Sequence, residues 1–167
     1  MKIKEIKIKL PTEKESVARF FENCERRKKF ISSEKENYKK HLQKAKHDLL
    51  RAVKEYEDEC WDWTVIKAYY ALHHAANALL LKKKGIFCKD HSCLIIALKQ
   101  YDLIEEKVFK EVSKIHESLA DILGLDLTFQ LRKLGQYDVN EWENITKEDA
   151  SLIIDIAKKI VSVAENE

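Results

Sequence analysis

Apolar residues recur at helical spacing along most of the chain. Between residues 38 and 56 they follow one another at intervals of four and three residues, which places them on one face of a helix. The segment 105–123 shows the same alternation, and the segment 147–164 carries a similar apolar stripe. These patterns predict amphipathic helices that each bury one face against the rest of the protein.

The segment 62–84 is apolar on two sides instead of one. Its two stripes are Val65, Tyr69, Leu72, Ala76 and Leu79, and the small residues Ala68, Ala71, Ala75 and Ala78. A helix with two apolar sides packs against several neighbours, so we expect this one at the centre of the fold. Three lysines and then Gly85 predict its end, because cations suit a helix C-terminus and glycine suits the position after it.

Shorter signals predict the remaining helices. Thr12 and Glu15 have the spacing of a capping box, so a helix should start there. Its expected buried residues are Val17, Phe20, Phe21, Cys24 and Ile31. Thr146 predicts a cap for the last helix, and Asp90 or Ser92 predicts one for a helix at 91–101. A further helix is expected at 125–134, with loops at 86–90 and 136–144.

The N-terminal segment 2–10 alternates lysine with isoleucine and leucine. Ile6, Ile8 and Leu10 would share one face of an extended strand. A single strand has no partner in an otherwise helical chain. The segment is therefore a docking arm, a strand added to another subunit, or loosely ordered.

The composition fits an all-α protein. Only three glycines and one proline occur in 167 residues, whereas turns and strand connections use both. Taken with the helix pattern, this predicts an up-and-down helical bundle with short connections. The formal net charge of +2 does not indicate bulk attraction to nucleic acid or anionic membrane, so only local patches could bind them.

The chain carries no apolar run long enough for a membrane span and no signal peptide pattern. We therefore expect a cytoplasmic protein. In that compartment Cys24, Cys60, Cys88 and Cys93 are expected to be thiols instead of disulfides.

The order of several stretches resembles a known family. "AYYALHHAANALLLKKKG" is followed by "KDHSCLIIAL", and later "LRKLGQYD" precedes "ITKEDA". Residues 36–165 in this order resemble the HEPN domain, in particular its small stand-alone prokaryotic members. Residues 1–35 then form an added arm and helix, and 36–167 form the HEPN-like bundle.

The resemblance implies a helical bundle that commonly dimerises. Many HEPN proteins are metal-independent RNA endonucleases or toxins, often encoded beside a small nucleotidyltransferase that restrains them. Others are binding or scaffold modules. The family fold therefore does not settle the activity.

The family's nuclease motif is an arginine followed, after four to six residues, by a histidine. The arginine would hold the scissile phosphate, and the imidazole would exchange a proton with the 2′-hydroxyl. At the matching position this chain has Arg132 followed by Tyr137 and Asp138, with no histidine. A phenol with a pKa of about 10 is a poor base at neutral pH, so weak or lost nuclease activity is expected.

Arg132 and Tyr137 remain candidates for binding phosphate or a base, by charge and by stacking. The alternative is structural: an ion pair between Arg132 and Asp138, with Tyr137 packed under the loop. In toxin–antitoxin members of the family, a tyrosine near the motif is a target for nucleotidylation by the partner, and Tyr137 matches that position.

His74 matches the family's usual histidine and is a candidate catalytic residue. Adjacent helix positions point about 100° apart, so His73 and His74 cannot easily serve one site. We interpret His74 as a hydrogen-bonded interior or interface residue, with proton transfer as the alternative. Of the tyrosine pair before them, Tyr69 or Tyr70 is expected in the core and the other near a dimer interface.

Cys88, His91 and Cys93 have a spacing that a metal could use, with Asp90 between them. No second cysteine or histidine pair lies nearby in the sequence, so we expect no metal there. His91 is instead expected to orient the loop, and it is also a candidate nucleotide contact.

The basic clusters are Arg26–Lys29 and Lys82–Lys84. We interpret each as solvated surface. If they share a face with Arg132, they would form a track for an RNA backbone.

With three isolated glycines the chain has no P-loop or dinucleotide-binding motif, so no cofactor is expected. Two functions remain open. The first is an RNA- or nucleotide-binding toxin-type protein with weak or lost endoribonuclease activity. The second is a non-catalytic helical partner of a separate nucleotidyltransferase chain. A homodimer is expected in both.

Overall fold

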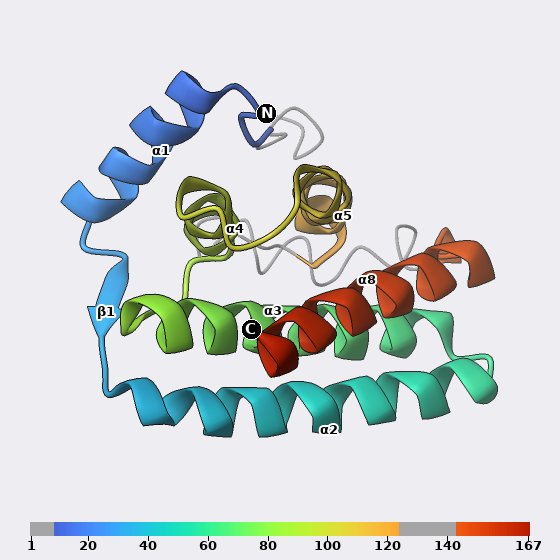
Figure 1. Cartoon of the computed structure of the whole chain (residues 1–167). Helices are drawn as coiled ribbons and strands as arrows, with labels where there is room; N and C mark the ends of the chain where they lie inside the picture. The colour runs from blue at the N-terminus through green and yellow to red at the C-terminus, as the bar shows by residue number, and fades with distance from the viewer. Residues whose placement is uncertain (1–8, 124–142) are drawn as a thin grey trace.

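The computed structural model describes residues 9–123 and 143–167 as a helical bundle (Figure 1). Its helices are α1 (Lys14–Arg26), α2 (Tyr38–Glu57), α3 (Trp61–Lys84), α4 (His91–Gln100), α5 (Glu106–Leu123) and α8 (Lys147–Asn166). A 3₁₀ helix, η2 (Lys35–Asn37), precedes α2, and two short strands are β1 (Phe30–Ser32) and β2 (Ile86–Cys88). This architecture confirms the predicted all-α class.

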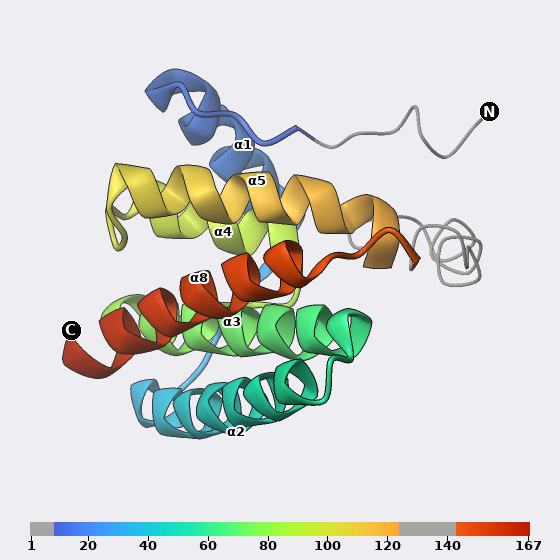
Figure 2. The same cartoon turned by 90° about the vertical axis from the view of Figure 1, so that its right-hand side faces the viewer.

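Helix α3 lies at the centre, as its two apolar sides predict. It packs against α2, α8 and α4, and α2 runs antiparallel beside it (Figure 1). The small residues at positions 68, 71, 75 and 78 are all fully buried, and this lets the neighbouring helices come close. The view in Figure 2 shows α2 on one side of α3, then α4 and α5 on the other, with α1 outermost.

Helix α1 lies against α4, outside the central bundle. It buries Val17, Phe21 and Cys24, and the ring of Phe21 stacks on Phe30. Just before α1, the backbone N–H of Leu10 donates to Oε1 of Glu117 at 2.9 Å. The first described residues are thereby fixed to α5.

The segment 86–90 was predicted as a loop, and for its first half this is wrong. Residues 86–88 form β2, which pairs with β1 in an antiparallel sheet that aligns Phe30 with Cys88 and Ser32 with Ile86. Ile31 lies in β1 and is 40% exposed, so its expected burial on the first helix is also wrong. Strands this short owe their pairing to the segment beside them, which a local pattern does not reveal.

The predicted capping box at Thr12 is wrong, whereas the one at Thr146 is confirmed. Helix α1 begins at Lys14 with Glu13 as its N-cap and without a side-chain cap bond, so Thr12 lies one residue too early. At α8, Oγ1 of Thr146 accepts from the N–H of Asp149 at 3.2 Å, and Oδ2 of Asp149 accepts from the N–H of Thr146 at 2.9 Å. Gly85 ends α3 in the left-handed conformation, with a φ of 70°, as predicted.

Three predicted segments lie outside the described residues. They are the arm up to residue 8, the helix at 125–134 and most of the loop at 136–144.

Candidate functional site

The phenol of Tyr69 joins α3 to two histidines on other helices. Its hydroxyl lies 2.9 Å from Nδ1 of His116 on α5 and 3.0 Å from Nδ1 of His91 at the start of α4. Tyr69 is buried at 2% exposure, so it is the core tyrosine of the pair, while Tyr70 is 46% exposed. The single phenol proton can be donated to one Nδ1 only, so the other Nδ1 donates to the phenol oxygen.

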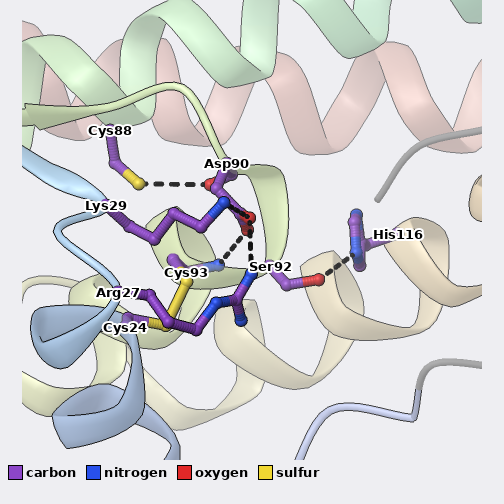
Figure 3. Close-up of polar contacts among 8 residues, drawn as sticks. All are labelled: Cys24, Arg27, Lys29, Cys88, Asp90, Ser92, Cys93 and His116. Atoms are coloured by element: carbon purple, nitrogen blue, oxygen red, sulfur yellow. Dashed lines mark hydrogen bonds and ion pairs between the residues drawn. A yellow bond between two sulfur atoms is a disulfide. The ribbon is translucent and has the colours of Figure 1, made fainter. Parts of the chain in front are cut away.

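His116 is fully buried and bonded at both ring nitrogens. Besides Tyr69, it meets Oγ of Ser92 at 3.0 Å through Nε2 (Figure 3). Ser92 lies in the first turn of α4, next to His91. The bonds therefore run from Ser92 through His116 and Tyr69 to His91 and tie together α3, α4 and α5.

His73 extends this network towards the surface. Its ring centroid lies 4.3 Å from that of His91, and both side chains are half-buried. Nε2 of His73 is 3.3 Å from Nδ2 of Asn77. Asn77 in turn donates to the carbonyl oxygen of Cys88 at 2.9 Å and accepts from its N–H at 2.8 Å. This buried amide holds β2 against α3 and so positions the loop before His91.

His74 points to the other side of α3, where it meets α2. Its Nδ1 lies 3.5 Å from Nδ1 of His41. Burial lowers the pKa of His74, and the neighbouring His41 lowers it further, while the Asp48 carboxylate raises it. Burial also lowers the pKa of His41. Two neutral imidazoles suit this arrangement, because one donates and the other accepts.

The candidate residues from the sequence fall into different places. His91 belongs to the network around Tyr69, whereas His74 belongs to the separate pair with His41. Arg132 and Tyr137 lie outside the described residues. Of the network around Tyr69, the sequence therefore predicted His91 as a site residue. The structure adds His73, Ser92 and His116.

The basic cluster at the end of α3 is engaged with other parts of the chain. Nζ of Lys82 donates to the carbonyl oxygen of Ala164, and Nζ of Lys83 lies 3.5 Å from a carboxylate oxygen of Glu167. Nζ of Lys84 lies 4.6 Å from the ring centroid of Tyr101. These contacts orient the lysines along the protein surface.

Asp90 organises the start of α4 (Figure 3). Its Oδ1 accepts from the N–H of Cys93 at 3.0 Å, which makes it the predicted N-cap. Its Oδ2 lies 3.2 Å from Nζ of Lys29 and 3.8 Å from a guanidinium nitrogen of Arg27. Part of the cluster Arg26–Lys29 therefore pairs with this carboxylate and anchors the chain after α1.

Cys24 and Cys93 form a disulfide, so the prediction of four thiols is wrong. The two residues are 69 positions apart in sequence, and the packing of α1 on α4 brings their Cα atoms within 5.9 Å (Figure 3). The Cys88–His91–Cys93 spacing does not act as a ligand set here, because Cys93 is bonded to Cys24 and His91 to Tyr69. No group of three or more possible metal ligands is found among the described residues.

A cavity of about 470 Å³ lies away from the histidines, between α5 and α8. Its walls are mainly apolar and include Ile115, Ile153 and Ile156, with Glu111 and Lys114 among the charged lining residues. Its lining contains no histidine.

The family model of the HEPN domain matches residues 38–167. The chain belongs to the HEPN domain family. No curated protein and no solved structure matches it. Family membership supports a helical module related to nucleotides or RNA, and HEPN domains often form dimers. In the described part of this HEPN chain, no helix is long and apolar enough to cross a membrane.

Some residues of the site carry a signal in the sequence. His116 interrupts the apolar stripe of α5, between Ile115 and Leu119, and a histidine inside such a stripe needs partners when buried. No local sequence pattern predicts the partners of His73 or His41. Their partners lie 18 and 33 residues away in sequence, on α4 and α3, so their roles depend on how the helices pack.

Proposed function

We propose that this HEPN protein binds RNA and cleaves its backbone slowly, without a metal ion. The observation that carries the proposal is the pair of half-buried imidazoles, His73 and His91, whose ring centroids are 4.3 Å apart. Imidazoles exchange protons near neutral pH, which is the task of the histidine missing after Arg132. The pair replaces that residue from elsewhere in the fold.

The reaction is an attack of a 2′-hydroxyl on the adjacent phosphate. An imidazole takes the hydroxyl proton while the 2′-oxygen bonds to phosphorus. The bond from phosphorus to the 5′-oxygen breaks, and this oxygen takes a proton. The products carry a 2′,3′-cyclic phosphate and a 5′-hydroxyl. The family resemblance assigns Arg132 to the phosphate, with Tyr137 beside it.

Slow cleavage follows from the arrangement of the pair. The two rings lie against each other, so both act from one side of a bound phosphate. An efficient in-line reaction places the base and the acid at opposite ends of the reacting group. With both rings on one side, a water molecule has to exchange the proton at one end of the reacting group. The hydrogen bond between Tyr69 and His91 fixes the orientation of the His91 ring, which faces the substrate.

The experiment incubates purified protein with a labelled RNA pool in EDTA. We expect fragments with 2′,3′-cyclic phosphate ends, and a loss of about 100-fold in rate for His73→Gln and for His91→Gln. His47→Gln is the matched control, because its side chain is 64% exposed and lies apart from the pair. Circular dichroism and thermal unfolding check that each variant is folded.

Each possible result tests a different part of the proposal. RNA that is bound but left intact contradicts the cleavage step and leaves binding in place. Cleavage that survives in both histidine variants contradicts the assignment to this pair. If the folded protein neither binds nor cleaves RNA, the proposed function is wrong.

The second candidate is a toxin-type or scaffold subunit that binds a separate nucleotidyltransferase chain, with Tyr137 as its target for nucleotidylation. The cavity between α5 and α8 favours it, because its mainly apolar walls could receive an apolar side chain of a protein partner. Coexpression with the neighbouring gene, followed by mass spectrometry of the peptide containing Tyr137, tests this role. An added nucleotide mass supports it, and an unmodified peptide in a chain that does not copurify with its neighbour contradicts it. A homodimer, as is common in the family, is proposed for both functions.

A further inference from the structure

One side of α3 is open to solvent, although the helix is central. Trp63 is 52% exposed and Tyr70 is 46% exposed. Lys67 lies between them on the same side, four residues after Trp63 and three before Tyr70. Among the large apolar side chains that are exposed in the described residues, these two are the aromatic ones. Exposed aromatic rings offer faces on which the bases of a nucleic acid can stack.

The spacing of the two rings suits bases that are not stacked on each other. Seven residues separate Trp63 from Tyr70, which places them on nearly one line along the helix, about 10 Å apart. Bases inside a duplex are stacked and paired and cannot reach two such rings. Bases of a single strand can be splayed out and can stack on aromatic side chains one by one.

A lysine on this side favours a polyanion. Nζ of Lys67 lies 5.9 Å from the ring centroid of Trp63, where it can meet a phosphate beside a stacked base.

We propose that this side of α3 is a track for single-stranded RNA, with one base on Trp63, one on Tyr70, and the backbone leading to His73 and His91. The track rests on the RNA-binding function proposed above. His73 follows Tyr70 after three residues, which is less than one helical turn. A strand held by the two aromatic rings would therefore present a backbone phosphate to the imidazole pair.

Stacking also explains how a chain with little net charge can hold RNA. The formal net charge is only +2, so attraction to phosphates in general is weak. Stacking on an aromatic ring contributes about 1–3 kcal/mol per base and works with any base. Two rings therefore add sequence-tolerant affinity to the attraction between local lysines and phosphates. A second copy of this chain is the other possible occupant, but it would have to bury Lys67 against the partner.

The test measures the affinity of the full chain for a labelled single-stranded oligonucleotide with 2′-O-methyl groups, which cannot be cleaved. Fluorescence anisotropy gives the dissociation constant. We expect Trp63→Ala and Tyr70→Ala each to weaken binding by about 5- to 100-fold. Trp63→Phe and Tyr70→Phe keep a ring and should retain most of the affinity. Leu50→Ala is the matched control, because Leu50 is 58% exposed on α2.

The outcomes separate this proposal from the function on which it rests. If the wild type binds the oligonucleotide and the two alanine variants bind equally well, the track is wrong while RNA binding stands. If the wild type does not bind, both are wrong. If Trp63→Ala converts a dimer to a monomer in light scattering and leaves the affinity unchanged, the side of α3 is a protein interface and the track is overturned. Retained binding by the duplex form of the same oligonucleotide would also contradict it.

Discussion

The hydroxyl of Tyr69 lies 2.9 Å from Nδ1 of His116, although 47 residues separate them in sequence. Both side chains are buried, and the bond is a direct polar link between the central helix and α5. Because His116 also meets Ser92 and Tyr69 also meets His91, this one contact determines how three helices hold the candidate site.

Replacing Tyr69 by Phe should therefore destabilise the protein. The change keeps the ring but removes the hydroxyl from its bonds to His116 and His91, which costs about 1–3 kcal/mol when the groups are buried. Urea unfolding of both proteins measures the difference in the free energy of unfolding. Tyr70→Phe is the control and should change it by less than about 0.5 kcal/mol, since Tyr70 is exposed. Equal stability of the two variants would contradict the role given to Tyr69.

The disulfide between Cys24 and Cys93 should be visible in solution and should stabilise the protein. Alkylation of the urea-unfolded protein without reductant should label Cys60 and Cys88 and leave the other two cysteines unlabelled, because unfolding exposes the buried Cys88. Reduction should lower the free energy of unfolding by about 2–4 kcal/mol, because the bond closes a long loop in the unfolded chain. The Cys24→Ser variant should unfold like the reduced wild type. Four labelled cysteines without reductant would instead support the sequence-based prediction of thiols.

Acidification should weaken the fold through His41 and His74. Burial lowers the pKa of both below the usual 6.5, so the unfolded chain binds protons more tightly than the folded one. The stability from these neutral imidazoles is complete above pH 6.5 and is lost as the pH falls through 6.5 towards the folded pKa values. The melting temperature should drop over this range.

The His74→Gln variant isolates this effect. Its melting temperature should fall less steeply between pH 7 and pH 5 than that of the wild type. His47→Gln serves as the control, because its side chain is largely exposed. A wild type and a His74→Gln variant with parallel pH curves would show that the pair does not titrate as described.

The two threonines at the predicted helix starts should respond differently to replacement by alanine. Thr146 takes part in a reciprocal capping box at α8, so Thr146→Ala should cost about 1 kcal/mol in the free energy of unfolding. Thr12 precedes the N-cap of α1 and should cost close to nothing when replaced. Chemical denaturation compares them, and a larger loss at Thr12 would place the start of α1 one residue earlier.

Much of the helical fold could be predicted from the sequence. The spacing of apolar residues located α2, α3, α5 and α8, since each helix must bury one face and the 3.6-residue repeat records which one. Thr146, Asp90 and Gly85 marked helix ends, because caps act within a few residues. Contacts this local can be predicted from the order of neighbouring residues.

The candidate site could be predicted only in part. His91 stood out through its place in the family pattern, while His116 gave a weaker signal as a polar residue in an apolar stripe. The pairing of His73 with His91 had no local signal, because it joins two helices across a loop. The same holds for β1 and β2, whose three residues each are too few to show a period.

The sequence by itself determined the helical class, most helix boundaries and the family, because these depend on spacing within one segment. The tertiary structure left the side of α3 that carries Trp63 and Tyr70 exposed. It also decided which distant groups meet: Cys24 with Cys93, and Tyr69 with His91 and His116. Such meetings depend on the packing of whole helices. Packing sums many weak contacts over the entire core, so no single stretch of sequence specifies it.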